Sequence, residues 1–453
     1  MDFDVVVVGA GPGGCVAGRD LARAGFHVGL FDSDTRETLG KTIIIEAEKA
    51  MFDRVAVARP GADEVPYHPQ SARIFSRRGK EAFEFHREIP SYGIYLDRLA
   101  KRLLADAEKS EAEFFGGYRA MQPVMTEGKI AGVAFEHGDR REEVRAKLVI
   151  DATGFNAALV RKLDPGLGIE FEEKSGDLVV AANQFCEIDP GKAELAVRTG
   201  KRRDNEVQNC LSPYGSYSTQ YSHLSLADRR AYILVGLKAD YDMPTPSELI
   251  EQYKREQGWF GKPIYGGKGS IRIRHSLDRL VADGFMAIGE AASQVIPAHG
   301  SGVSSALYAG HLAAKAAIPA LRSGKADTAA LWPYARQYQS GRGAVLATLS
   351  AVRLMADSLS EDRLATMLEQ GIMAEEDLYS ALVPEFASIS LRTLPQRILG
   401  FAKNPGLLRP MARTLKAVAT LRFHYSKYPK TYDPQEFAAW KQKTQRIFKS
   451  LGY

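Results

Sequence analysis

The first 32 residues combine two short apolar runs with a helical stretch between them. Residues 3–8 form an apolar run rich in valine, which is typical of a strand buried on both faces. Residues 15–24 are good helix formers, and Gly25 follows them as a stop signal. A second apolar run, over residues 27–31, ends in Asp32. This order predicts a β-α-β unit at the start of the chain.

Apolar positions recur at helical spacing in several later parts of the chain. They predict helices over residues 99–107, 303–318, 344–356, 361–369 and 375–382. The pattern is helical from Lys325 onward, so we expect a helical C-terminal part. A different spacing, with every second position polar or aromatic, predicts one face of a strand at Tyr217, Thr219, Tyr221 and His223.

The composition is that of an ordinary water-soluble globular protein. The 453 residues are 45% hydrophobic and 25% charged, and no apolar run approaches the roughly 20 residues that span a bilayer. The N-terminus has no basic leader, so we expect a cytoplasmic protein. Its three cysteines are widely spaced and include no C-x-x-C pair, which argues against a disulfide framework and against a zinc site. We therefore expect no bound metal.

A glycine-rich turn joins the first predicted strand to the first helix. It contains Gly9, Gly11, Pro12, Gly13 and Gly14. In a dinucleotide-binding turn, Gly9 permits the bend, Gly11 lets the backbone approach a pyrophosphate, and Gly14 lets the helix pack on the strand. Asp32 then accepts hydrogen bonds from a ribose. The alternative is a glycine-rich turn without a nucleotide, and the flanking strands, helix and terminal acid all favour the dinucleotide.

The C-terminal part contains a long stretch without acids. No Asp or Glu occurs between Glu385 and Asp433, whereas nine Lys and Arg are interleaved with apolar residues. Three interpretations compete for this basic segment, residues 386–432: a surface for anionic lipids, a site for a phosphorylated or carrier-linked substrate, or a solvated face paired with acids elsewhere. Nucleic acid is not expected, because no recognised binding motif accompanies the charge.

Three segments resemble motifs of flavin hydroxylases and related reductases, and the resemblance implies FAD. Arg98 stands where an arginine of those proteins contacts the cofactor, and a strand that ends beside the ADP moiety carries Asp151 and Gly154. Gly289 and Glu290 occupy the end of a strand that brings an acid to the ribitol hydroxyls. The usual acid there is Asp, so Glu290 keeps the acceptor chemistry with one additional methylene.

The third of these segments continues into a turn with the sequence Pro297-Ala-His299-Gly300-Ser301-Gly302. In the flavoproteins it resembles, this turn aims a helix N-terminus at the flavin N1/O2 edge, which becomes negative on reduction. His299 has two interpretations: a hydrogen-bond donor to the flavin edge, with a catalytic role, or a cap of the turn.

Matches along the whole chain most resemble the geranylgeranyl reductase family. They include residues 48–53, 149–155, 274–278, 296–302 and 425–429. The resemblance implies an α/β fold with three domains. We expect a dinucleotide-binding (Rossmann-like) FAD domain (1–60, 90–165 and 268–325) that is interleaved with an antiparallel-sheet substrate domain (61–89 and 166–267). A helical C-terminal domain (326–453) is expected to follow. Its implied reaction is reduction of isoprenoid C=C bonds, with hydride from flavin N5 and electrons from ferredoxin or NAD(P)H.

The chain departs from the family at two places. Family reductases carry Lys-x-Cys-Gly near the flavin, whereas this chain keeps the lysine as Lys41 and has Ile43 in place of the cysteine. We predict Lys41 to contact the cofactor. Glu46 or Glu48, with a pKa raised by apolar surroundings, would then replace the cysteine as proton donor, unless both are solvated helix-start residues.

The second departure lies in the substrate domain. The family motif Tyr-x-Trp-x-Phe-Pro corresponds here to residues 212–221, which lack both the tryptophan and the final proline. Tyr217 becomes a candidate catalytic residue in a pocket more polar than a prenyl tunnel. The alternative is that these hydroxyls make structural bonds at a sheet edge.

Three functional hypotheses follow. The first is an FAD-dependent reductase of an isoprenoid or other large apolar substrate, peripheral to the inner face of the membrane. The second is a flavin monooxygenase acting on a more polar, ring-containing substrate. The third is a flavin-binding protein without catalysis that binds a lipid or a protein partner.

Overall fold

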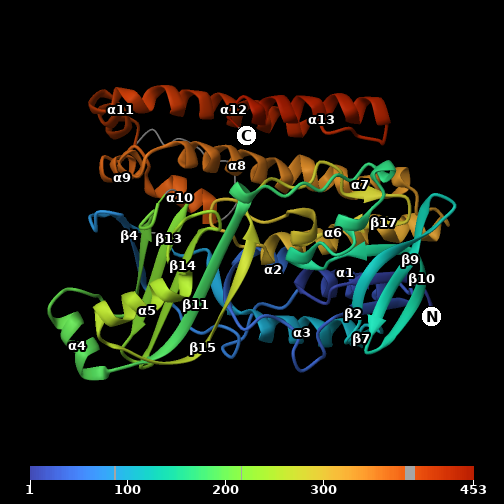
Figure 1. Cartoon of the computed structure of the whole chain (residues 1–453), viewed down its shortest axis with the longest axis horizontal. Helices are drawn as coiled ribbons and strands as arrows, with labels where there is room; N and C mark the ends of the chain where they lie inside the picture. Colours follow the sequence, from blue (N-terminus) through green and yellow to red (C-terminus); the bar gives the residue numbers. More distant parts are fainter. Residues whose placement is uncertain (86–87, 216, 383–392, 453) are drawn as a thin grey trace.

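The structure is a computed structural model that describes residues 1–85, 88–215, 217–382 and 393–452. It has three parts (Figure 1): a mixed sheet towards the N-terminus, an antiparallel sheet at the opposite end, and C-terminal helices lying along one side of both. This is the α/β architecture expected from the sequence. Within the described residues, no helix is both long and apolar enough to cross a membrane.

The mixed sheet has the order β16-β17-β10-β1-β2-β7, and β8 and β9 continue from β10. Its strands are β1 (Asp2–Val8), β2 (Val28–Asp32), β7 (Glu113–Gly116), β8 (Arg119–Thr126), β9 (Lys129–His137), β10 (Arg140–Asp151), β16 (Val281–Ala282) and β17 (Phe285–Ala287). β1 pairs in parallel with both β2 and β10, which confirms the predicted β-α-β unit. The valines of β1 are almost fully buried, as expected for a strand that is covered on both faces.

Helices α1 (Pro12–Arg23), α3 (Leu96–Glu108) and α6 (Val303–Arg322) pack beside this sheet, and α1 contacts both of the others. The helix predicted for 15–24 begins at Pro12, because the fixed φ of proline suits the first helical turn. The helix predicted for 303–318 continues to Arg322 and includes Pro319.

The second sheet has the order β15-β11-β14-β13-β12-β4-β5. Its strands are β4 (Ser71–Ser76), β5 (Glu81–Glu84), β11 (Leu178–Ile188), β12 (Glu206–Leu211), β13 (Ser218–Ser225), β14 (Arg230–Lys238) and β15 (Phe260–Arg272). Every neighbouring pair is antiparallel except β4 and β12. Helices α4 (Pro190–Arg198) and α5 (Pro246–Gln257) complete this part. A small sheet of β3 (Ile44–Glu48) and β6 (Ser91–Tyr95) contacts both parts, since Ala47 packs in the core of the first and Ile44 packs with Phe185 and Tyr232 of the second. Helix α2 (Lys49–Arg54) directly follows β3.

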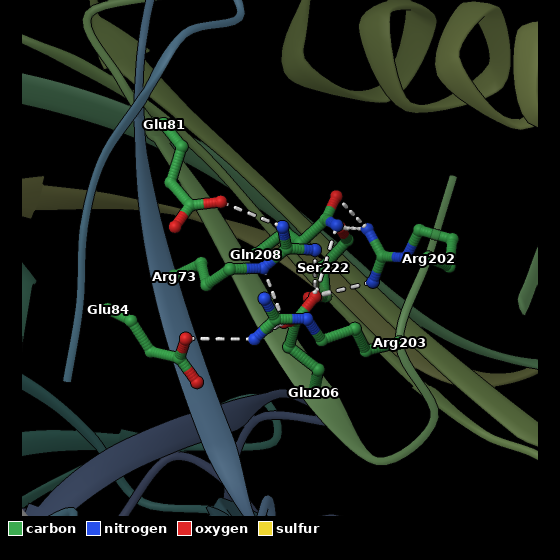
Figure 2. A network of polar contacts seen from close by, with 8 residues as sticks. All are labelled: Arg73, Glu81, Glu84, Arg202, Arg203, Glu206, Gln208 and Ser222. Atoms are coloured by element: carbon green, nitrogen blue, oxygen red, sulfur yellow. Dashed lines mark hydrogen bonds and ion pairs between the residues drawn. The ribbon is translucent and has the colours of Figure 1, made fainter. Parts of the chain in front are cut away.

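A charged network joins β4 to the rest of the second sheet (Figure 2). Arg73 of β4 binds both carboxylate oxygens of the fully buried Glu206 of β12, at 2.5 and 2.8 Å, and also contacts Glu81 at 2.9 Å. Arg202 donates to Gln208 and to Ser222 at 2.5 and 3.0 Å. The fork of an arginine fits a carboxylate in two places, so the pair also fixes the register of the parallel strands.

The C-terminal helices are α7 (Thr328–Tyr338), α8 (Ala344–Ser358), α9 (Glu361–Glu369), α10 (Glu375–Leu382), α11 (Leu394–Lys403), α12 (Leu408–Ser426) and α13 (Pro434–Lys449). A π-helical turn, Gln339–Gly343, connects α7 directly to α8. Short 3₁₀ turns occur at Gly154–Asn156, Val160–Lys162, Pro165–Leu167, Ser175–Asp177, Gly289–Ala292 and Pro405–Leu407. The helices predicted for 361–369 and 375–382 are confirmed residue for residue, whereas residues 383–392, including Arg392 of the basic segment, lie outside the described residues.

Candidate active site

The glycine-rich turn leaves space for a Cβ at only one of its four glycines. A Cβ at Gly14 would lie 1.9 Å from the backbone oxygen of Gly9, and one at Gly9 would lie 2.3 Å from the oxygen of Ala152. A Cβ at Gly11 would meet no atom within 4 Å. Gly11 is the N-cap of α1 and has no side-chain cap, so the first N–H groups of the helix have no side-chain acceptor. This open, uncapped helix start fits the diphosphate of a dinucleotide.

Asp32 lies at the end of β2, as the sequence predicted. One carboxylate oxygen accepts from the backbone N–H of Ala10 at 2.7 Å, and the other accepts from that of Asp34 at 2.8 Å. The first bond ties the acid directly to the glycine-rich turn. An anchored carboxylate at this point fits the predicted ribose contact, because a carboxylate can accept further hydrogen bonds on the same oxygens.

Asp151 is fully buried at the end of β10 and accepts four hydrogen bonds from its own loop. The donors are the backbone N–H groups of Thr153, Leu159 and Val160 and the Thr153 hydroxyl, at 2.7 to 3.0 Å. Burial is the main cause that raises the pKa of this carboxyl. Four bonds fill the ordinary capacity of a carboxylate, so Asp151 positions the loop that contains Gly154. The place of this loop beside the cofactor stays a prediction.

Glu290 lies in the 3₁₀ turn that follows β17, and its side chain faces the end of β15. One of its carboxylate oxygens accepts from the backbone N–H of Arg272 at 3.0 Å, and burial raises its pKa. Arg272 also donates to the Phe155 carbonyl at 2.9 Å, beside Gly154. The additional methylene of Glu290 thus bridges the turn and the second sheet, and its contact with the ribitol stays a prediction.

The turn from Pro297 to Gly302 is compact and ends at an uncapped helix. The Gly300 N–H donates to the Ile296 carbonyl at 2.9 Å, with the glycine at φ +80°, and Gly302 is an N-cap of α6 without a side-chain bond. The Ser301 N–H donates to Nδ1 of His299 at 3.4 Å, which is the capping role considered for this histidine. The second open helix start fits the flavin edge, and the catalytic role of His299 stays a prediction.

Glu46 and Glu48 lie in different surroundings, and neither is a solvated helix-start residue. Glu48 is buried and its carboxylate binds Arg342 at 2.5 and 3.2 Å. Glu46 is half-buried in β3 and has no ion pair with a described residue. Burial raises the pKa of Glu46 from 4.5 to about 7. The hydroxyl of Ser301 donates to the backbone carbonyl of Glu46, so β3 is attached to the turn at the start of α6.

Glu46 lines a cavity of about 260 Å³ together with Tyr67 and Tyr221. The two tyrosine hydroxyls are 3.4 Å apart, and burial raises both of their pKa values well above normal. Lys49 and the largely exposed Glu88 also line the cavity and form an ion pair at 2.6 Å. The wall of the cavity therefore includes the carboxyl of Glu46, which has no ion pair with a described residue, and the neutral phenols of Tyr67 and Tyr221.

The residues that alternate along β13 divide between the two roles considered, a polar pocket wall and structural hydrogen bonds. Tyr221 lines the cavity, whereas Thr219 binds Asn209 at 2.7 Å and His223 binds Asn205 at 2.9 Å. Tyr217 precedes the strand, and its hydroxyl would lie 3.9 Å from a Cβ added at Gly300. Tyr217 thus lies near the turn that precedes α6, and its catalytic role stays a prediction. Residue 216 of this stretch lies outside the described residues.

Three predicted positions lie around the edge of this site. The Ile43 side chain lies near Gly267, and the backbone carbonyl of Ile43 accepts a hydrogen bond from the Tyr265 hydroxyl at 3.4 Å. The Lys41 ammonium would lie 3.7 Å from a Cβ at Gly269. Arg98 is exposed, lies 4.3 Å over the ring of Tyr95 and donates to the Asp63 carbonyl. The contacts of Lys41 and Arg98 with the cofactor stay predictions.

Sequence reasoning missed Tyr67 and Arg342. Tyr67 lies in the connection before β4, where no periodic pattern marks it, and Arg342 lies in the π-helical turn of the C-terminal part. Neither has a local signal, because the partners of each come from distant segments. In the part of the chain that the structure describes, no cluster of three or more His, Cys, Asp or Glu could hold a metal ion.

Comparison with known sequences gives one family and a group of distant relatives. A family model described as an FAD binding domain matches residues 2–346. The digeranylgeranylglycerophospholipid reductase of Sulfolobus acidocaldarius is 24% identical over 99% of this chain and 97% of its own length. The Haloferax volcanii protein of that name is 26% identical, over 92% of this chain and 95% of the relative.

Comparison with solved structures supports the fold. A geranylgeranyl bacteriochlorophyll reductase-like protein from Thermoplasma acidophilum has a TM-score of 0.72 at 18% identity, covering 91% of this chain and 99% of that one. A flavin-dependent brominase has a TM-score of 0.61 at 16% identity, covering 90% and 100%. A probable FAD-dependent monooxygenase from Pseudomonas aeruginosa has a TM-score of 0.55 at 18% identity, covering 81% and 99%. Different chemistries thus share this fold, so the reaction must be argued from the site.

Proposed function

The chain belongs to the family of the FAD binding domain, as an FAD-dependent oxidoreductase, and we propose that it reduces C=C bonds of an isoprenoid or another large apolar substrate. The main support is the position of Glu46, which joins the substrate-side cavity to the turn at the start of α6. The distant relatives, named as reductases of a digeranylgeranyl lipid, support the same class of substrate.

The cofactor fits two uncapped helix starts, at Gly11 and at Gly302. Asp32 would hold the adenosine ribose, and the Ser301 backbone would face the flavin edge, where helix N-termini favour negative charge. Lys41, Arg98 and Glu290 complete the proposed set. A bound FAD, once reduced, would supply a hydride.

The residues of the chain then have two tasks. Glu46, protonated up to about pH 7, holds the proton that the second alkene carbon needs, and it replaces the sulfur that Ile43 lacks. Solvent restores this proton through the cavity entrance. Tyr67 and Tyr221 remain neutral and keep the wall of the cavity in place. Since an isolated alkene offers little charge to stabilise, positioning and exclusion of water carry most of the catalysis.

The polar wall of the cavity favours one other candidate. The paired hydroxyls of Tyr67 and Tyr221, 3.4 Å apart, could bind a polar substituent of a ring. The alternative function is therefore a flavin monooxygenase acting on a more polar, ring-containing substrate.

The basic segment supports a peripheral contact with a membrane. Exposed apolar side chains follow one another along α11 and α12, in the outer helical layer of Figure 1: Leu394, Ile398, Leu399, Leu408, Leu415 and Phe423. Exposed cations accompany them at Arg409, Lys416, Arg422 and Lys427. Within the same segment, Arg397 pairs with Asp377 and Arg413 donates to the Ser450 carbonyl. We propose that this surface lies on anionic lipid at the inner face of the membrane.

One experiment separates the candidates. The flavin of the holoenzyme is reduced chemically without oxygen and then mixed with an unsaturated isoprenoid lipid or with oxygen and an aromatic substrate. Oxidation of the flavin by the lipid, with a saturated product by mass spectrometry, supports the reductase. A hydroxylated aromatic product supports the monooxygenase, and the absence of both products leaves a binding protein. The same apparatus then compares ferredoxin with NAD(P)H as the proposed electron donor.

A further inference from the structure

A second cavity, of about 270 Å³, lies away from the candidate active site. Its walls are the loop from Gly168 to Lys174, the segment from Arg274 to Arg279, and one face of α13, which belongs to the outer helical layer in Figure 1. It shares no lining residue with the cavity of Glu46. Its volume is at the lower limit for small-molecule sites, so a ligand there would be small.

Two carboxylates of this second cavity are already paired. Glu170 forms an ion pair with Lys441 of α13, and Glu172 forms one with Lys174 at 3.8 Å. These pairs add no net charge to the cavity. Its electrostatic character therefore depends on the charged side chains that remain.

Three cations and one acid remain in the lining: Arg274, Arg279, Lys449 and Asp278. Arg279 is fixed by three hydrogen bonds, and Lys449 has no ion pair with a described carboxylate. Burial lowers the pKa of His275, so this neighbouring imidazole is neutral at pH 7. The second cavity thus carries a positive excess that suits a dianion.

Two buried polar atoms in these walls lack a partner. The Arg274 side chain is only 8% exposed, and its Nε makes no hydrogen bond, although its NH1 donates to the Glu172 carbonyl at 2.6 Å. Oδ1 of Asp278 is likewise buried without a partner. An unsatisfied buried polar group destabilises the folded protein, so a ligand that bonds to both atoms would recover part of this cost.

The chemistry of such a ligand follows from these groups. A phosphate monoester carries nearly two negative charges at pH 7 and offers several acceptor oxygens to arginine and lysine. Burial raises the pKa of Asp278 to about 6, so an adjacent dianion would leave this carboxyl protonated and able to donate a hydrogen bond. The aromatic stack of His275 on Phe448, with ring centroids 4.1 Å apart, gives the ester group an apolar wall.

We propose that the cavity between α13 and the 274–279 segment binds a phosphate monoester, at a site separate from the one for FAD. The ester is either a soluble metabolite or the headgroup of a lipid. The segment also bonds to the turn that contains Glu290, because Leu277 donates to the Ala292 carbonyl at 3.0 Å. Bound ligand would stabilise the holoenzyme by mass action.

The test uses the FAD-loaded protein, so that the dinucleotide turn is filled. Glycerol 3-phosphate is titrated calorimetrically at low salt, with glycerol as the uncharged control. Vesicles containing phosphatidic acid are compared with vesicles containing phosphatidylglycerol, an anionic phosphodiester that the basic surface of α11 and α12 would bind equally. Saturable binding of either phosphate ester, tighter than that of its control, supports the site, and the arm that binds identifies the source. No binding tighter than that of the control in either arm overturns the proposal.

Variants locate the binding. Lys449→Gln should weaken it about threefold, and Arg274→Gln at least about tenfold. Lys443→Gln is the matched control, since Lys443 is exposed on the same helix and does not line the cavity. If Arg274→Gln does not fold, Lys449→Gln decides the result. Equal affinity in Lys449→Gln and Lys443→Gln would place any observed binding elsewhere and overturn the assignment.

Discussion

The hydroxyl of Ser301 donates a hydrogen bond to the backbone carbonyl of Glu46, although 255 residues separate them in the chain. The bond joins the turn proposed to face the flavin with the strand that carries the proposed proton donor. A side-chain hydroxyl therefore holds this strand and this turn together before any ligand binds.

Replacing Glu46 by Gln should lower turnover at least about 100-fold, the usual scale for the loss of a general acid. The wild-type rate should fall as the pH rises through about 7, where Glu46 loses its proton, and the variant should show no such fall. Steady-state rates between pH 5 and 9 provide the measurement. Glu194→Gln, an exposed change on α4, is the control, and unchanged turnover in Glu46→Gln would remove the proposed role.

The same carboxyl should make stability depend on pH. Its pKa is about 7 in the folded protein and about 4.5 when solvated, so the folded state binds the proton more tightly. The resulting stabilisation is complete below about pH 4.5 and is lost as the pH rises through 7. Denaturation midpoints of Glu46→Gln should therefore fall less between pH 5 and 8 than those of the wild type. Parallel curves for the two proteins would contradict this expectation.

Replacing Ser301 by Ala should weaken FAD binding about fivefold, because it removes one hydrogen bond and leaves the Glu46 carbonyl with one donor fewer. Fluorescence titration of the apoprotein with FAD measures the change. Ser350→Ala removes a buried hydroxyl that has no partner and is the control. Equal FAD affinity in both variants would show that this contact does not position the turn.

Two glycine replacements should have different effects. Gly14→Ala should prevent folding, since its Cβ would lie 1.9 Å from a backbone oxygen, whereas Gly11→Ala meets open space and should fold. Because this space is proposed to hold the diphosphate, Gly11→Ala should purify with little flavin. The ratio of flavin to protein absorbance, with circular dichroism for folding, tests both. Gly191→Ala on α4 is the control, and full flavin content in Gly11→Ala would exclude the proposed position of the diphosphate.

Breaking the Glu48–Arg342 pair should destabilise the protein by about 3–5 kcal/mol. Glu48→Gln leaves the buried charge of Arg342 unpaired, and Arg342→Met leaves the buried carboxylate of Glu48 without its donor. The double variant should recover part of the loss. Chemical denaturation compares the four proteins. Additive effects of the two single changes would show that the pair is not coupled.

The surface of α11 and α12 should bind vesicles that contain anionic lipid. Reversing Lys416 and Arg422 to Glu should weaken this binding at least about tenfold, and high salt should abolish it. Arg198→Glu with Lys201→Glu changes the net charge equally on the opposite side of the molecule, near α4 (Figure 1), and should have no effect. Cosedimentation measures all three proteins, and absence of binding at low salt would exclude the lipid surface.

Local patterns predicted much of the fold. The β-α-β unit and two C-terminal helices follow from periodicity within single segments, and the structure confirms them. The helix predicted for 99–107 begins earlier, at Leu96, because its first turn is too short to show a period. The pairing of β4 with β12 could not be predicted, since it joins segments far apart and leaves no repeat in either. The domain limits remain a prediction.

The candidate site was predicted less completely. Gly9, Gly11, Gly14 and Asp32 belong to one motif with fixed spacing, and the structure brings them together. The different environments of Glu46 and Glu48 could not be predicted from the sequence, because Arg342 and Tyr67 come from distant parts of the chain. The interpretation of both glutamates as solvated helix-start residues was wrong for the same reason. Burial of a titratable group is a property of the assembled fold, not of its neighbours in sequence.

The parallel strand β4 has a consequence for folding. Its partner β12, and the buried Glu206 that receives Arg73, lie 133 residues later. During synthesis, β5 can pair with one edge of β4 at once, but the edge that binds β12 must remain open until the later strands of the sheet have emerged. Loops of this length close slowly, and an unpaired strand edge invites association with other chains. We expect a slow refolding phase whose rate depends on this pair, and a need for low protein concentration or chaperones during refolding.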